Sequence, residues 1–167
     1  MRPHPGSSHD NLPDSAEQSA GAEPTGPRLL GLHHVTAISA DLERTTAFYR
    51  DVLGLELVRE GRNDDDPDAR HFWFGDAHGT AGTLVSFMEY REMERGRVGV
   101  GTTHHFAFAV ASASELESWR DHLRAREVAC TEVFERGGLR SVYLRDPDGH
   151  IVEIATRGPG FPPGASA

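Results

Sequence analysis

The sequence predicts an α+β fold made of two copies of one unit, a strand and a helix followed by three strands. Three observations support this prediction. Extended and helical apolar patterns recur in the same order twice along the chain. A pair of adjacent histidines opens each copy, at positions 33–34 and 104–105. The last two strands are joined by the sequence DPDG at 146–149, which is typical of a type I turn in a tight hairpin.

The first copy begins with a strand-like run at residues 31–38. A helix is expected at 41–53, because the apolar side chains at 42, 48, 49, 52 and 53 fall on one stripe, and Gly54 ends it. Three more extended runs follow. They lie at 55–58, 71–74 and 83–88.

The second copy repeats this order, beginning with a strand-like run at 103–110. Ser114 and Glu117 have the spacing of a capping box, with the serine as N-cap of the next helix. The apolar stripe of this helix consists of Leu116, Trp119 and Leu123. Three strands are expected after it, at 129–134, 139–144 and 150–155.

These boundaries predict one domain at 29–161, with a first unit at 29–92 and a second at 101–161. Residues 1–28 are rich in Pro, Gly, Ser and Ala and nearly lack large apolar side chains, so they are expected to form a disordered N-terminal tail. Residues 162–167 form a short C-terminal tail. No segment has the pattern of a secretory signal or the length of a membrane span, which predicts a cytoplasmic protein without a membrane partner.

Charge and cysteine content exclude two further classes. The formal net charge of −9 repels phosphate backbones, so no nucleic-acid partner is expected. The single cysteine, Cys130, cannot form an internal disulfide and is interpreted as a small half-buried strand residue.

One histidine from each copy and one glutamate form a candidate metal-ligand set. A four-stranded sheet alone would leave one face uncovered, so the two units are expected to combine around a shared, concave interior. His34 and His105 hold the same place in the first strand of each unit, and Glu153 lies among apolar neighbours on the last strand. A metal would offset the cost of burying that carboxylate. In the first unit Ser86 stands where Glu153 would be, which leaves three predicted ligands: His34, His105 and Glu153.

The remaining polar features are interpreted as structural or solvated. His71, His78 and His122 are expected to be ordinary surface or edge residues, and His150, just after the hairpin turn, to face solvent. The acidic segment at 64–68 lacks the glycine and closing glutamate of a calcium-binding EF-hand loop, so it is expected to be a surface loop.

Two segments carry a resemblance to a known family. The runs GLHHVT at 31–36 and DPDGHIVE at 146–153 resemble the vicinal oxygen chelate superfamily of glyoxalases, fosfomycin-resistance proteins and extradiol dioxygenases. The resemblance covers about residues 29–161 and implies a glyoxalase-like domain with a metal site on a concave mixed β-sheet. A narrower similarity, to dioxygenases that cleave hydroquinone rings, rests on four short segments, at 74–76, 82–84, 143–147 and 153–161.

This resemblance implies a site and an activity. The metal would be Fe(II), bound by His34, His105 and Glu153. The substrate pocket would be lined by neighbouring residues, namely His33, Thr36, His104, Arg136 and Tyr143. The substrates would be O2 and a hydroquinone or catechol, with Tyr143 and Arg136 stabilising the substrate oxyanion and His33 or His104 acting as general acid or base.

Two questions of geometry stay open. Strict strand alternation sends the two histidines of each pair to opposite faces, so a bend or a neighbouring unit must bring His33 and His104 to the pocket. Dioxygenases of this kind are longer chains, so here either one chain closes the site or two chains exchange units. A homodimer is expected.

Three alternative functions compete with ring cleavage. The first is a thiol transferase or epoxide-opening resistance enzyme of the fosfomycin type, with Mn(II) on the same three ligands. That reaction needs a cluster of cations, and near Glu153 the sequence offers only arginines: Arg136, Arg140, Arg145 and Arg157. A glyoxalase is disfavoured, since Ser86 replaces its fourth ligand. The third alternative is a non-enzymatic protein that sequesters an aromatic antibiotic and binds no metal.

Overall fold

The computed structural model describes residues 26–158 of the chain. By its contacts the chain divides into Met1–Leu30 and Gly31–Ala167, and the fold described below belongs to the second part. Of the two predicted tails, residues 1–25 and 162–167 lie outside the described residues. No helix within 26–158 has the length and apolar composition needed to cross a membrane.

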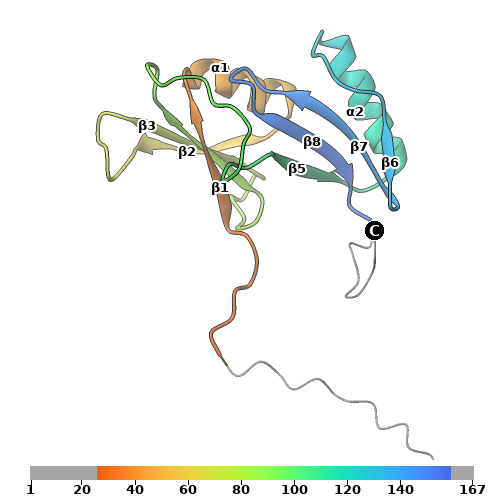
Figure 1. Ribbon diagram of the computed structural model, residues 1–167, viewed down its shortest axis with the longest axis horizontal. Coiled ribbons are helices and arrows are strands. Elements are labelled where there is room, and N and C mark those ends of the chain that lie inside the picture. The colour runs from red at the N-terminus through yellow and green to blue at the C-terminus, as the bar shows by residue number, and fades with distance from the viewer. Residues whose placement is uncertain (1–25, 159–167) are drawn as a thin grey trace, which may run out of the picture. The chain divides into compact units, whose positions relative to one another are not determined.

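The first repeat is a four-stranded sheet with one helical segment (Figure 1). Its elements are β1 (His34–Ser39), α1 (Leu42–Thr46), η1 (Ala47–Val52), β2 (Glu56–Arg62), β3 (Arg70–Gly75) and β4 (Leu84–Glu89). The strand order is β1-β4-β3-β2, in which only the β1–β4 pair is parallel. The predicted single helix is an α-helical turn that continues as a π-helix, and this wider turn buries both Phe48 and Tyr49.

The second repeat has the same topology. Its elements are β5 (His105–Val110), α2 (Ala113–Ala125), β6 (Phe134–Arg136), β7 (Leu139–Arg145) and β8 (Ile151–Thr156). The strand order is β5-β8-β7-β6, again with a single parallel pair, β5–β8. The predicted fold class, two βαβββ units of mixed sheet, is therefore confirmed.

Strand register confirms the predicted equivalence of Ser86 and Glu153. In the first repeat Thr36 of β1 pairs with Ser86 of β4. In the second repeat Ala107 of β5 pairs with Glu153 of β8. His34 lies two residues before Thr36, and His105 lies two residues before Ala107. His34 therefore corresponds to His105, and Ser86 corresponds to Glu153.

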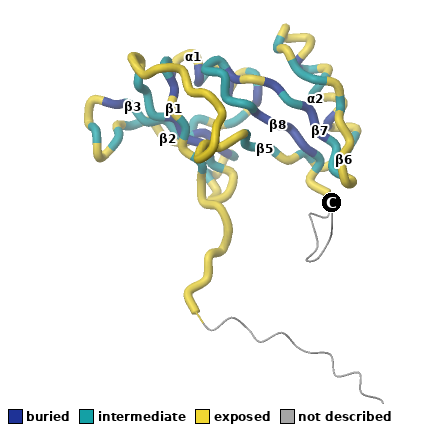
Figure 2. The backbone as a smooth tube through the Cα atoms, in the orientation of Figure 1, coloured by how far each residue is buried: buried dark blue, intermediate teal, exposed yellow. Residues whose placement is uncertain are grey.

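The two repeats share one hydrophobic core on the helix-covered faces of their sheets. Val85 and Phe87 of β4 point into it from the first repeat, and Val152 and Ile154 of β8 from the second. Helix α2 packs on β7 and β8 (Figure 1) and adds its apolar stripe, as predicted. Figure 2 shows burial concentrated in the strands and helices, whereas the connecting residues 91–104 are exposed. Period-two alternation therefore turns Ser86 and Glu153 away from the core, onto the opposite faces.

Hydrogen bonds also join the repeats. The Tyr49 hydroxyl donates to Oδ2 of the buried Asp146 at 3.1 Å. Nε2 of His150 lies 2.9 Å from the Ile38 carbonyl oxygen, and Nε2 of His122 lies 2.9 Å from that of Val52. The predictions that His150 faces solvent and that His122 is an ordinary surface residue are therefore wrong, because each imidazole connects one repeat to the other.

The DPDG hairpin forms as predicted. The backbone N–H of Gly149 donates to the Asp146 carbonyl at 3.0 Å. Oδ1 of Asp146 also accepts from the backbone N–H groups of Asp148 and His150, at 3.0 and 2.8 Å. Gly149 has a φ of +95°, a conformation that favours glycine at this position.

Two predicted details of the second repeat are wrong. The N-cap of α2 is Ser112, not Ser114, and its hydroxyl accepts from the backbone N–H of Glu115 at 3.2 Å. The strand predicted at 129–134 is reduced to an isolated bridge at Cys130, and the edge strand β6 begins only at Phe134. Cys130 is half-buried, as expected.

Candidate metal centre

The buried carboxylate of Glu153 lies at the centre of the candidate site. Only 4% of the residue's surface is exposed, and Oε2 lies 2.9 Å from Nε2 of His105 on the adjacent strand. Oε1 has no hydrogen-bond partner among the described residues. A buried carboxylate oxygen without a partner is costly, and a cation offsets that cost. The imidazole nitrogen and the carboxylate therefore fit a divalent metal ion.

His34 holds the equivalent place in the first repeat, but the chain does not gather it with the other two predicted ligands. Its ring packs on Trp73, with 4.7 Å between ring centroids. Among residues 26–158, three ligand-bearing side chains converge within 4.8 Å only at another place. The structure thus brings together two of the three predicted ligands, His105 and Glu153.

The first histidine of each pair contacts the second. Nδ1 of His33 lies 3.1 Å from Nδ1 of His34, and Nδ1 of His104 lies 2.8 Å from Nδ1 of His105. Strands β1 and β5 begin at the second histidine, so His33 and His104 precede the strands and escape strict alternation. A hydrogen bond at Nδ1 fixes the ring and leaves Nε2 for a metal. His33 and His104 are therefore placed to orient the predicted ligands.

A row of side chains leads from His105 across the second sheet. Tyr143 lies directly opposite Glu153 in the strand register, and its ring centroid is 5.8 Å from that of His105. The ring of Phe134 is 6.2 Å from that of Tyr143, and the guanidinium of Arg136 lies over Phe134 at 5.0 Å. Phe134 did not figure among the predicted site residues. The sequence signal for it was its alternation with Arg136, which a strand predicted to end at residue 134 concealed.

The equivalent face of the first repeat is held by hydrogen bonds between uncharged groups. Oγ of the fully buried Ser86 lies 2.8 Å from Oγ1 of Thr36 and 3.0 Å from Nε2 of His71. Burial lowers the pKa of His71, and the charges of Arg59 and His34 act in the same direction. The prediction that His71 is an ordinary surface or edge residue is therefore wrong.

A cavity of about 540 Å³ adjoins the site. Three predicted site residues, Thr36, His104 and His105, contribute to its lining. The hairpin at 147–151 and part of the segment that connects the repeats complete its walls. The cavity is large enough for a small aromatic molecule.

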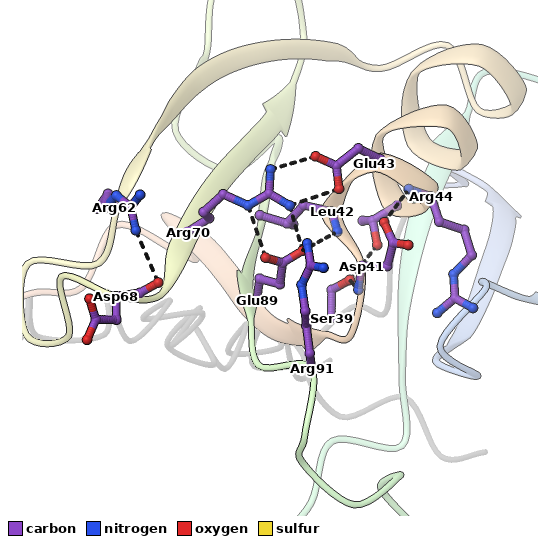
Figure 3. Close-up of polar contacts among 11 residues, drawn as sticks. Ser39, Asp41, Leu42, Glu43, Arg44, Arg62, Asp68, Arg70, Glu89 and Arg91 are labelled. Carbon is purple, nitrogen blue, oxygen red and sulfur yellow. Dashed lines mark hydrogen bonds and ion pairs between the residues drawn. The ribbon is translucent and has the colours of Figure 1, made fainter.

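A cluster of three acidic side chains outside this site is bound by an arginine side chain. Asp41, Glu43 and Glu89 lie close enough together to suggest a cation site. However, the Arg70 guanidinium donates to both oxygens of Glu89, at 2.6 and 3.0 Å, and to both oxygens of Glu43, at 2.6 and 2.8 Å (Figure 3). These bonds lower the pKa of Glu43 and of Glu89 to about 2. Because arginine already supplies the positive charge, the group is an ion-pair network.

Comparison with known proteins assigns the family. Residues 31–154 match the model of the Glyoxalase/Bleomycin resistance protein/Dioxygenase superfamily. The chain belongs to this superfamily. A solved structure described as a dioxygenase from Bacillus subtilis superposes with a TM-score of 0.73 at 33% identity, covering 79% of this chain and 42% of that one.

Three relatives carry the names of two kinds of enzyme. MhqE of Bacillus subtilis, named as a ring-cleaving dioxygenase, is 39% identical over 130 residues, which are 77% of this chain and 43% of MhqE. The chlorohydroquinone/hydroquinone 1,2-dioxygenase of Sphingobium indicum is 29% identical over 123 residues, 72% of this chain and 38% of that enzyme. The metallothiol transferase FosB of Staphylococcus epidermidis is 28% identical over 128 residues, 75% of this chain and 83% of FosB. The chain thus spans less than half the length of the two dioxygenase relatives.

Proposed function

We propose that the protein is an Fe(II)-dependent dioxygenase that cleaves the ring of a hydroquinone- or catechol-type diol with O2. The single observation that carries the proposal is the Glu153 carboxylate, buried beside His105 with Oε1 unpaired. Two imidazoles and one carboxylate are the protein ligands of many non-haem Fe(II) oxygenases. Similarity to relatives named as ring-cleaving dioxygenases supports the same reaction class.

Each predicted residue has a role in this reaction. His34, His105 and Glu153 would hold Fe(II), which when bound would supply the centre at which the diol and O2 react. The Tyr143 hydroxyl would donate to the negative charge that develops on the substrate oxygen, and Arg136, at the outer end of the row, would attract that anion. His104 or His33 would exchange a proton with the diol, since imidazole does so near neutral pH.

Thr36 has a different part. Its hydroxyl is 2.8 Å from Ser86, so it would hold the inner wall of the pocket rather than take part in proton transfer.

A second copy of the chain would supply the third ligand. His105 and Glu153 converge within one chain while His34 stays with Trp73 in the first repeat. Strands β1 and β5, which carry the two histidines, are both edge strands of their sheets, and edge strands are the ones that can pair with another chain. In the proposed homodimer, the first repeat of each chain faces the second repeat of its partner, which gives two identical sites.

Oxygen uptake tests the proposed function. Chain stripped with a chelator would be reloaded with Fe(II) under anaerobic conditions and then mixed with O2 and a panel of ortho- and para-diols. We expect consumption of one O2 per diol, with loss of the aromatic absorbance, for at least one member of the panel. Absence of O2 uptake with every hydroquinone and catechol would refute the proposal.

One observation favours a second candidate, a metal-dependent thiol transferase of the fosfomycin type. The chain spans most of FosB, whereas it spans less than half of the dioxygenase relatives. Two of the four arginines near Glu153 are engaged elsewhere, because Arg140 pairs with Glu117 and Arg145 donates to the Gly149 carbonyl, which argues against a phosphonate substrate. Mn(II)-loaded chain incubated with fosfomycin and a thiol is therefore expected to give no adduct, and formation of an adduct would favour this second function.

A further inference from the structure

Trp73 has no role in the activity proposed so far, yet its ring contacts two imidazoles, those of His34 and His71, on the face that carries His34. We propose that Trp73 is the wall against which the aromatic ring of the substrate stacks, so that the site selects flat, unsaturated diols over saturated ones. The inference rests on the proposed function and adds to it a residue that determines substrate class.

Strand register places Trp73 on the same face as the predicted ligand. Trp73 of β3 pairs with Ser86 of β4, and His34 and Thr36 of β1 share that face. The indole centroid is 4.7 Å from the ring of His34 and 4.8 Å from the ring of His71. A ligand bound at Nε2 of His34 would therefore lie within reach of the indole.

The repeat supplies an independent argument. Trp73 stands opposite Ser86 just as Tyr143 stands opposite Glu153, so the two aromatic residues occupy equivalent positions. Each of them lies beside the histidine of its own repeat. Tyr143 offers a hydroxyl next to a carboxylate, whereas Trp73 offers the larger apolar ring next to an uncharged serine. One face is thus suited to the oxygens of a diol and the other to its ring.

The indole is also held in place before any ligand binds. Nε2 of His71 is 3.0 Å from Oγ of Ser86, which is itself bonded to Thr36. His71 in turn packs on one side of Trp73 at an interplanar angle of 37°. A preorganised aromatic surface binds a flat ring with little loss of conformational entropy.

Fluorescence offers a direct test, because the chain contains two tryptophans. Trp119 lies on α2, packed on the core and on His122, away from the site. In the Trp119→Phe variant Trp73 is therefore the single tryptophan, and in the Trp73→Phe variant Trp119 is. Both variants would be loaded with Zn(II), which is redox-inactive, so that the diol is not consumed. Each would then be titrated anaerobically with methylhydroquinone and with cyclohexane-1,4-diol.

Saturable quenching of Trp119→Phe by methylhydroquinone, with none by cyclohexane-1,4-diol, is expected. Trp73→Phe should show only linear, collisional quenching by methylhydroquinone and none by cyclohexane-1,4-diol. Equal, unsaturable quenching of both variants would overturn the inference.

A binding measurement separates this inference from the proposed function. Trp73→Leu should weaken methylhydroquinone binding by about 3- to 10-fold, and Trp73→Phe, which keeps a ring, should weaken it less. Oxygen uptake by Trp73→Leu with an unchanged KM for methylhydroquinone would refute the stacking role of Trp73 but not the proposed dioxygenase activity. Saturable quenching of Trp119→Phe by methylhydroquinone, without any oxygen uptake by the Fe(II)-loaded protein, would refute the dioxygenase activity but not the stacking role of Trp73.

Discussion

The two repeats have the same topology and register but opposite chemistry on the faces that point away from the core. In the second repeat, the buried Glu153 keeps one oxygen unpaired beside His105. In the first repeat, Ser86 at the equivalent position is bonded to both Thr36 and His71. The polar groups around Ser86 thus bond to one another, whereas on the second face the Glu153 carboxylate contacts His105 and its Oε1 has no hydrogen-bond partner among residues 26–158. Duplication therefore preserved the backbone, and one side-chain difference assigns the charge of the metal site to the second repeat.

The largest expected effect comes from mixing two inactive variants. His34→Ala and His105→Ala should each lower kcat/KM for the diol by more than about 100-fold, because each removes a predicted ligand. If a site takes His34 from one chain and His105 from another, refolding the two variants together restores one of the two sites in hybrid dimers. Activity should then return to about one quarter of the wild-type value.

Absence of any recovery in the mixture would show that one chain closes its own site. Mixing His105→Ala with Glu153→Ala serves as a control, because both changes affect the same repeat. This second mixture should stay inactive: every hybrid site then lacks one ligand.

Replacing the tyrosine hydroxyl should have the next largest effect. Tyr143→Phe keeps the ring beside His105 but removes the proposed donor to the substrate oxyanion, so kcat should fall by about 10- to 100-fold with little change in metal content. Steady-state oxygen uptake measures the fall, and iron analysis of the same samples serves as control. An unchanged kcat would assign Tyr143 to packing alone.

The contact between the repeats should have a smaller effect, on stability. Tyr49→Phe removes the donor to Asp146, a carboxylate buried at the junction, and should lower the free energy of unfolding by about 1–2 kcal/mol. Urea denaturation followed by circular dichroism would measure this change. A loss below about 0.3 kcal/mol would mean that this bond does little to join the repeats.

The smallest expected effect is on the acid stability of the first repeat. The pKa values of Glu43 and Glu89 are held at about 2 by Arg70, below the ordinary value of 4.5. A carboxylate with a lowered folded-state pKa stabilises the fold above its unfolded pKa, and that contribution disappears as the pH falls from about 4.5 to 2. Glu89→Gln should be less stable at pH 7 and should lose less of its melting temperature between pH 5 and 2.5. An equal loss of melting temperature between pH 5 and 2.5 in Glu89→Gln and wild type would contradict this prediction.

Much of this comparison could be predicted from the sequence, because it depends on periodicity. The recurrence of a histidine pair and of the helix stripe fixes the duplication, and strand alternation fixes the correspondence of Ser86 with Glu153. The DPDG turn was predictable for a different reason, since local residue preferences determine it.

The parts that could not be predicted depend on long-range register or on ambiguous local signals. Trp73 and His71 reach the His34 face through the pairing of β3 with β4, which depends on the intervening turn. The N-cap was ambiguous because Ser112 and Ser114 are each followed three residues later by a glutamate, so the local pattern fits both starts. His150 and His122 bond to carbonyls of the other repeat, a contact that no local pattern encodes.

Anaerobic Fe(II) binding by Glu153→Gln and Ser86→Ala tests the division of chemistry between the repeats most directly. The two variants change equivalent positions of the two sheets, and both side chains are buried. Equilibrium dialysis of wild type should give about one Fe(II) per chain. Ser86→Ala should keep this stoichiometry with an affinity within about threefold, whereas Glu153→Gln should lose at least about 100-fold in affinity. Unchanged binding in Glu153→Gln, or loss of binding in Ser86→Ala alone, would contradict the assignment of the metal to the second repeat.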